Sequence, residues 1–279
     1  MKFAKYWQQI IVPANKSIFG SDKIPIWGAS NESEEQALSE AQQRANRFKA
    51  FFSEGFNKQD EYEYSVGFIR EEVIEEIKNP HGDTLAVLTR NSYGACVLNT
   101  EQVLIGDIDY PSPGMLDRIL SIFGKKPKDK ACFLDLIKTY QEKNTHFKIK
   151  VYETFGGLRF IICDKLFTSG ADTVYQIFKD LEVDPLYAQL CKRQSCFRAR
   201  LTPKPWRMDI ERPPNRFPRQ NENETQKFKS WLENYQHASK HKCAAREIAT
   251  YGSASTHPDV RMVIELHDKI ACPSAETLA

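Results

Sequence analysis

Two aspartates spaced two residues apart end an apolar run that starts at Val103, and their types and spacing suit them to metal chemistry. Side chains alternate between the two faces of a strand, so Asp107 and Asp109 are expected to point the same way. Adjacent carboxylates repel each other unless a divalent cation lies between them, and hard cations prefer oxygen ligands. The spacing predicts a Mg²⁺ or Mn²⁺ site at Asp107 and Asp109. The alternative is a strand that runs out into a turn at 111–114.

A second candidate region is strongly basic. Residues 191–219 carry nine lysines and arginines against two acidic residues, in a chain whose net charge is +2. Trp206, Phe217 and several prolines are interleaved with these charges. Such a segment suits a phosphate backbone or a nucleotide, because phosphate contacts dominate nucleic-acid binding. The alternative is a solvated, proline-rich connector. The side chains predicted to contact phosphate are Arg198, Arg200, Lys204 and Arg207.

Composition places the chain among ordinary globular proteins, with 279 residues, 41% of them apolar and 27% charged. That length is sufficient for one large domain or two modest ones. The seven cysteines lack metal-ligand spacing, and several lie in apolar patterns, which is typical of reduced, buried thiols. Apolar runs fall short of membrane-spanning length, and the start of the chain lacks a signal-peptide core. We therefore expect a cytoplasmic protein with no membrane partner.

The elements that must position these residues begin with a predicted α/β region. A strand is expected at 6–14, and a helix at 30–55, where capping residues and early acids precede apolar residues at helical spacing. Residues 62–67 are predicted to be extended, and residues 70–77 to form a short amphipathic helix. Two apolar runs around a Gly-containing turn indicate a hairpin at 84–98.

From residue 103 the predicted elements follow a recognisable order. This β-α-β-β-α-β order is that of the split ferredoxin-like or RRM-like unit, in which all four strands share one sheet. The remainder of the chain, residues 222–279, is expected to be helical. With a βαββαβ unit, an N-terminal α/β extension and a C-terminal helical cap, the predicted fold class is α+β. The expected elements are a strand at 103–109, helices at 115–123 and 131–141, a hairpin at 147–163, a helix at 171–181 and a strand at 196–202.

An acid-x-acid strand followed by a hairpin with a Gly-Gly turn resembles the palm of the archaeo-eukaryotic primase superfamily. Those enzymes carry a DxD on one strand, a Ser/Gly-rich turn that leads to a histidine on the hairpin, and a third aspartate on a later strand. Asp107 and Asp109 match the first motif. The segment 154–159 matches the second in its turn, with Arg159 in the place of the histidine. The later strand reads Phe197–Arg200 and carries basic residues instead of the acid.

The resemblance implies a metal-dependent nucleotidyltransferase-like protein, or one that binds a nucleotide or nucleic acid. Asp107 and Asp109 would be its catalytic residues and its Mg²⁺ or Mn²⁺ ligands, and Arg159 would hold phosphate, which a guanidinium binds in bidentate fashion. A third carboxylate would come from Asp164, Asp184 or Asp209. The implied domains are an N-terminal region at 1–100 packed on the palm, a palm at 101–205, a basic connector at 206–221 and a helical cap at 222–279.

Arg159 suits a second role equally well, namely a structural ion pair with one of the aspartates. The second functional class is a non-enzymatic nucleic-acid-binding or scaffold protein on an RRM-like fold. Such domains need exposed aromatic residues on the central strands, and Phe160 is the candidate here. A GT-A-type glycosyltransferase also uses Asp-x-Asp, but a parallel sheet would have to precede it where a hairpin is predicted.

The C-terminal part offers weaker candidates for chemistry. His237 and His241 are one helical turn apart with Cys243 close by, which makes a metal site conceivable without a supporting motif. His267 and Asp268 suggest an oriented imidazole, but helical neighbours face apart, so core or surface roles are expected for both.

Overall fold

The computed structural model describes residues 1–54, 68–111, 128–274 and 277–279, with the side chains of 50–54 left aside. The chain forms two compact units, one of residues 2–70 and one of residues 71–279 together with Met1. The predicted elements at 62–67 and 115–123 lie outside the described residues.

The smaller unit is a hairpin covered by a helix. Strands β1 (Tyr6–Pro13) and β2 (Lys23–Ser30) pair antiparallel, with the short α1 (Lys16–Phe19) between them. Helix α2 (Glu34–Glu54) buries three alanines at four-residue spacing, Ala37, Ala41 and Ala45. Gly28 allows this close approach, because a Cβ there would lie 2.0 Å from the carbonyl oxygen of Ala37. The expected strand and helix are confirmed; β2 was not predicted.

The larger unit contains two four-stranded antiparallel sheets. Central strands of both sheets are buried on both faces, as expected for their apolar runs. The first sheet has the order β3 (Glu72–Lys78), β4 (Thr84–Arg90), β5 (Cys96–Thr100) and β9 (Phe197–Arg200). The second has the order β11 (Ala245–Tyr251), β7 (Ile149–Thr154), β8 (Gly157–Ile162) and β6 (Ile105–Asp109).

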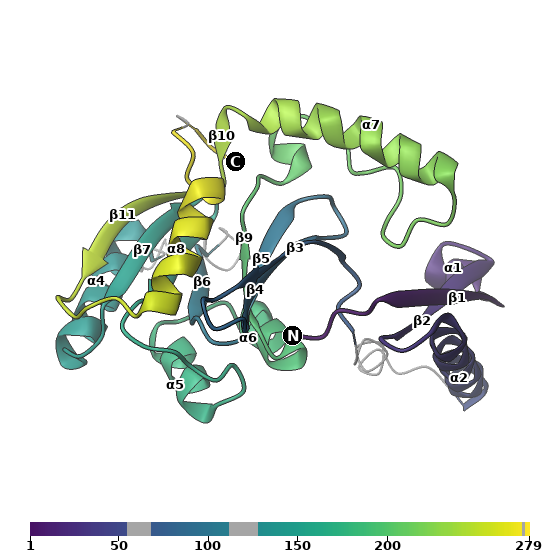
Figure 1. Ribbon diagram of the computed structural model, residues 1–279, viewed down its shortest axis with the longest axis horizontal. Helices are drawn as coiled ribbons and strands as arrows, with labels where there is room; N and C mark the ends of the chain where they lie inside the picture. Colours follow the sequence, from purple (N-terminus) through teal and green to yellow (C-terminus); the bar gives the residue numbers. More distant parts are fainter. Residues whose placement is uncertain (55–67, 112–127, 275–276) are drawn as a thin grey trace, which may run out of the picture. The chain divides into compact units, whose positions relative to one another are not determined.

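Helices cover and flank these sheets (Figure 1). Helix α8 crosses the second sheet, where its buried residues join the strands in one hydrophobic core. Strands β10 (Lys242–Cys243) and β12 (Thr277–Leu278) form a short parallel pair. The helices are α4 (Lys130–Lys143), α5 (Asp172–Asp180), α6 (Pro185–Gln194), α7 (Glu222–Ser239) and α8 (Pro258–Ala271), with the 3₁₀ turn η2 at Pro205–Arg207.

The expected α+β class is confirmed, and the order β6, α4, β7, β8, α5, β9 follows the predicted elements. The arrangement in space differs, because β9 pairs with β5 in the first sheet and not with β6. The hydroxyl of Tyr187 on α6 explains this. It lies 2.7 Å from the carbonyl oxygen of Ile105 and 3.0 Å from that of Arg198, and it accepts the Arg198 N–H at 3.3 Å. One side chain thus occupies backbone groups that a β6–β9 ladder would use.

Two local predictions were wrong, and one helix was not predicted. Residues 72–78 form strand β3 and not a helix, because pairing with β4 outweighs the helix propensity of a Glu-rich segment. Residues 245–251 form the edge strand β11 beside β7, although the whole C-terminal region was expected to be helical. No helix was predicted between residues 181 and 196, where residues 185–194 form α6, which Asp184 caps with Pro185 in the first turn.

Candidate phosphate-binding cleft

A cleft of about 430 Å³ opens in the larger unit, where both sheets contribute to its walls. Its charged lining brings together residues from β6, β8 and β9 and from the segment that follows β9. The predicted site residues therefore meet in one place, although the sequence separates them by up to a hundred positions. The charged residues are Glu71, Asp107, Asp109, Arg159, Arg198, Arg200, Lys204 and Arg207.

Asp107 and Arg159 form an ion pair across neighbouring strands, since the register places them opposite each other on β6 and β8. The Arg159 Nε donates to Asp107 Oδ1 at 2.9 Å, and its second terminal nitrogen donates to Oδ2 at 3.4 Å. The Arg159 side chain is 2% exposed, whereas that of Asp107 is 31% exposed. Burial alone would lower the pKa of Arg159, but the Asp107 carboxylate raises it above its ordinary value. The ion-pair alternative for Arg159 is therefore what the structure contains.

The guanidinium is held from its other side as well. Its remaining nitrogen lies 3.0 Å from the carbonyl oxygen of Arg200 and 3.2 Å from Nε2 of His267. His267 is fully buried on α8, and burial lowers its pKa despite the neighbouring Asp268 carboxylate. A neutral imidazole can accept from the guanidinium at Nε2 only if Nδ1 carries the proton, and Nδ1 lies 2.9 Å from Asp268 Oδ1.

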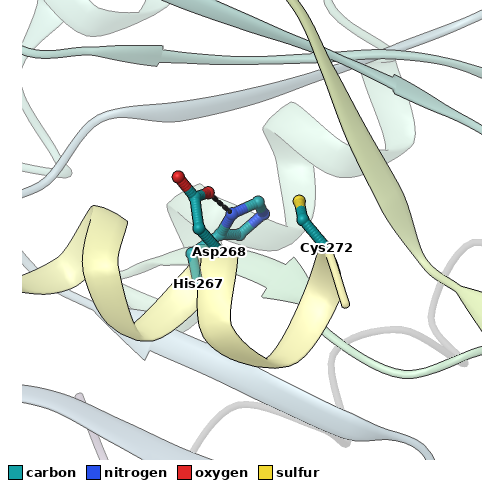
Figure 2. Close-up of side chains that lie close together, drawn as sticks. All are labelled: His267, Asp268 and Cys272. Atoms are coloured by element: carbon teal, nitrogen blue, oxygen red, sulfur yellow. Dashed lines mark hydrogen bonds and ion pairs between the residues drawn. The ribbon is translucent and has the colours of Figure 1, made fainter. Parts of the chain in front are cut away.

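The core role expected for His267 is confirmed by its burial, but the expectation that His267 and Asp268 face apart is wrong. Although they are helical neighbours, the Asp268 carboxylate reaches back to the imidazole, as Figure 2 shows. Asp268 also accepts from the Lys150 ammonium at 2.7 Å, and the imidazole packs on the Tyr152 ring at 4.6 Å between centroids. Side chains 108 positions apart are thus joined in one buried polar chain, which no local sequence pattern indicates.

His267, Asp268 and Cys272 also stand close enough to be considered as a metal site, with possible ligand atoms within 4.8 Å of one another (Figure 2). Both imidazole nitrogens are already engaged, one with Asp268 and one with Arg159. Burial raises the pKa of the Cys272 thiol to about 12, which disfavours the thiolate that metals bind. As arranged, the group does not fit a metal ion. The other predicted set, His237, His241 and Cys243, is not such a group among the described residues.

Three cations in the cleft lack a carboxylate partner among the residues that the structure describes, namely Arg200, Lys204 and Arg207. Burial and the adjacent Arg159 charge lower the pKa of Arg200. Burial, Arg200 and Arg207 lower the pKa of Lys204. Burial and Arg200 lower the pKa of Arg207 to about 10, and one terminal nitrogen of Arg207 is buried without a hydrogen-bond partner. The cluster is a set of like charges that an anion would relieve.

Arg198, the other predicted phosphate contact, is occupied. Its guanidinium donates to both carboxylate oxygens of Glu71 at 2.6 and 2.7 Å and to the Gln194 side chain at 2.6 Å. The Glu71 charge raises the pKa of Arg198 against the effect of burial. Arg219, farther along the basic segment, donates from its two terminal nitrogens to the two carboxylate oxygens of Glu72, at 3.0 and 2.9 Å. The basic segment therefore combines structural ion pairs with unpaired cations.

The acidic side of the cleft centres on Asp109, the exposed residue at the end of β6. Partial burial, Asp184 and Asp107 raise its pKa, in that order of effect. Of the three candidates for a third carboxylate, Asp184 is the one whose charge acts on Asp109. Asp164 instead accepts the backbone N–H of Lys148 at 2.9 Å. The carboxylate of Asp184 also caps α6, accepting two backbone N–H groups.

The predicted metal ion can be tested against these donors. Asp107 does not fit a metal ligand in this arrangement, because a guanidinium spans both of its oxygens. Asp184 is committed to the helix cap, which leaves Asp109 as the carboxylate open to the cleft.

Two exposed aromatic side chains lie beside the cleft cations, Trp206, which belongs to the predicted basic segment, and Phe155, which the sequence did not point to. Phe155 in the β7–β8 turn is 56% exposed and Trp206 in η2 is 44% exposed. The Arg207 guanidinium lies 4.0 Å from the Phe155 ring centroid, and Tyr93 packs edge-on against Trp206 at 5.3 Å. Phe160, the aromatic residue predicted to be exposed, is fully buried. The signal for Trp206 was present in the basic segment, whereas nothing local marked Phe155.

Comparison with protein-family models, with curated proteins and with solved structures gave no match to this chain. Among the described residues no helix has both the length and the apolar character needed to cross a membrane.

Proposed function

We propose that the cleft binds the phosphate groups of a nucleotide or of single-stranded nucleic acid. The observation that carries this proposal is the cluster of Arg200, Lys204 and Arg207, three like charges in one cavity without a carboxylate partner among the described residues. Partly desolvated cations bind phosphate more strongly than exposed ones, and guanidinium groups match phosphate in bidentate geometry. An anionic ligand would also satisfy the buried nitrogen of Arg207.

The exposed aromatic rings favour a ligand that carries bases over inorganic phosphate. Phe155 and Trp206 stand on separate turns beside the same cations. Stacking of bases on such rings is tolerant of sequence and is the usual partner of a cationic groove in single-strand binding. These features support the binding function, including its non-enzymatic form as a nucleic-acid-binding or scaffold protein. The RRM-like sheet with exposed aromatics on its central strands is not needed for it.

Metal-dependent nucleotidyl transfer by a divergent primase-like palm is the second candidate. One observation favours it, namely that Asp184 and Asp107 both lie close enough to Asp109 to help raise its pKa, after burial. It would require the Asp107 carboxylate to leave Arg159. Primer extension with Mn²⁺ and nucleoside triphosphates tests it, with the Asp109→Asn variant as the matched control.

The binding proposal is tested by fluorescence anisotropy with short labelled single strands of DNA and of RNA. The double variant Lys204→Met, Arg207→Met is expected to weaken binding at least about tenfold and to reduce the salt dependence by roughly one unit of slope per lost phosphate contact. The control is Lys229→Met, which removes an exposed charge from α7, outside the cleft. Equal affinity of the double variant and the native chain would refute the proposal.

A further inference from the structure

The Asp107 carboxylate meets a guanidinium at the place where the DxD pattern would hold a divalent cation. Both of its oxygens accept from Arg159, at 2.9 and 3.4 Å. A cation placed on Asp107, which is 31% exposed, would have to share these oxygens with the positive charge of Arg159, which is only 2% exposed. Like charges at such a distance repel strongly when they are shielded from water.

The guanidinium is also fixed from behind, so it cannot readily yield to an ion. Its third nitrogen has two acceptors, the Arg200 carbonyl oxygen and His267 Nε2. The imidazole is held in turn by Asp268, and Asp268 by Lys150, which also contacts Glu247 at 3.1 Å. Six elements, β6, β7, β8, β9, β11 and α8, are tied together by this chain. Its polar atoms are satisfied along its length, which is the condition under which a buried network becomes rigid.

The charge of Arg159 also acts on the cleft, since it is one of the causes that lower the pKa of Arg200. A phosphate bound by the cationic cluster would therefore feel the positive potential of Arg159 from its position beside Asp107. In a metal-dependent site the ion supplies that potential. In this cleft the Arg159 side chain supplies the positive potential, and it does so without a bound ion.

We infer that Arg159 takes the place of a divalent cation at Asp107, so that the cleft binds its phosphate-bearing ligand without divalent metal, and that His267 is the residue that positions Arg159. This inference rests on the proposed phosphate-binding function. It adds to that function a statement about metal dependence and names a positioning residue on α8, far from the cleft in sequence.

The first test uses Mn²⁺ alone, followed by electron paramagnetic resonance and calorimetry. We expect the native chain and Asp107→Asn to bind Mn²⁺ equally weakly. Arg159→Met, which removes the charge at similar length, is expected to gain about tenfold or more in Mn²⁺ affinity, and Arg159→Met, Asp107→Asn to lose that gain. Mn²⁺ binding by the native chain that Asp107→Asn abolishes would overturn the inference, and this comparison holds even if Arg159→Met fails to fold.

The second test measures binding of the labelled single strands in EDTA and in Mn²⁺. Equal affinity of the native chain in both buffers is the expected result. Binding only with Mn²⁺ would overturn the metal-independent role of Arg159 and leave the proposed function intact. Absence of binding in both buffers would overturn the proposed function and metal-free binding together.

The role of His267 is tested by two substitutions. His267→Leu removes the acceptor and is expected to release Arg159, so that Mn²⁺ then changes oligonucleotide affinity several-fold. His267→Gln keeps a side-chain oxygen that can accept from Arg159 and should restore metal independence. If His267→Leu lowers thermal stability and leaves binding metal-independent, the residue is a packing residue and not a positioning one.

Discussion

Arg198 on β9 and Arg207 in the segment after it differ in environment although they belong to one basic run. Arg198 is buried, and it donates two short hydrogen bonds to Glu71 and a third to the side-chain oxygen of Gln194. Arg207 has an aromatic ring and other cations around it, and one of its nitrogens has no partner. The difference teaches that charge density alone does not locate a binding site. Arg198 is part of an ion pair in the wall of the cleft, whereas Arg207 has no ion-pair partner among the described residues and belongs to the proposed phosphate-binding cluster.

Removal of Arg198 is expected to have the largest effect. Arg198→Met leaves the Glu71 carboxylate, 12% exposed, without its partner. Breaking a buried pair from one side costs about 3–5 kcal/mol in the free energy of unfolding, measured by urea denaturation. The double variant Arg198→Met, Glu71→Gln should recover part of the loss. A decrease in the free energy of unfolding of less than about 1 kcal/mol would show that Arg198 does not stabilise the fold through its ion pair with Glu71.

Loss of an aromatic ring at the rim is expected to come next. Phe155→Ala should weaken single-strand binding by about 1–3 kcal/mol, the range for one stacked base, with little change in stability because the ring is largely exposed. Leu186→Ala, which truncates an exposed apolar side chain on α6, is the matched control. The measurement is the anisotropy titration, and an equal effect of the two variants would remove Phe155 from the binding surface.

A dependence of stability on pH is expected from His267. Its pKa is lowered in the folded chain by burial, which outweighs the opposing effect of Asp268. As the pH falls below about 6.5, the unfolded chain therefore takes up a proton that the folded chain does not, and stability is lost as the pH falls. Native protein should lose more stability than His267→Gln between about pH 7.5 and about pH 5.5, as followed by urea denaturation. Equal losses would show that His267 is not held neutral.

The smallest effect is expected from Arg207 on stability. Arg207→Met removes a charge whose pKa is lowered by burial and Arg200, so the free energy of unfolding should change by less than about 0.5 kcal/mol or rise slightly. The same variant should weaken oligonucleotide binding. This pairing of unchanged stability with lost affinity is the reverse of the result expected for Arg198→Met, and a large destabilisation would erase the contrast between the two regions.

The spacing of apolar and polar residues along the sequence predicted the elements that depend on local sequence. The alternation at Asp107 and Asp109 and the Gly-Gly turn after Thr154 were sufficient to predict β6 and the β7–β8 hairpin. The Asp184-Pro185 pair carried the capping signal for α6, which was overlooked. The Glu-rich β3 has helix propensity that only its pairing with β4 overrides. The contact of Arg159 with His267 depends on how α8 docks on the sheet, and that is a tertiary fact without a local signature.

The hydroxyl of Tyr187 separates the two sheets of the larger unit. The strand orders β3-β4-β5-β9 and β6-β8-β7-β11 would join into a single eight-stranded sheet if β9 and β6 were paired. The Tyr187 hydroxyl lies at that junction, within hydrogen-bond distance of the Ile105 carbonyl oxygen on β6 and of the Arg198 carbonyl oxygen and N–H on β9. The two sheets are therefore separate at this junction. The cleft with its cations opens beside it, and Tyr187 is one of the residues that line the cleft. Because the Tyr187 hydroxyl contacts backbone groups of both β6 and β9, the two sheets remain separate there, and the cleft in which we propose that phosphate binds lies beside this junction.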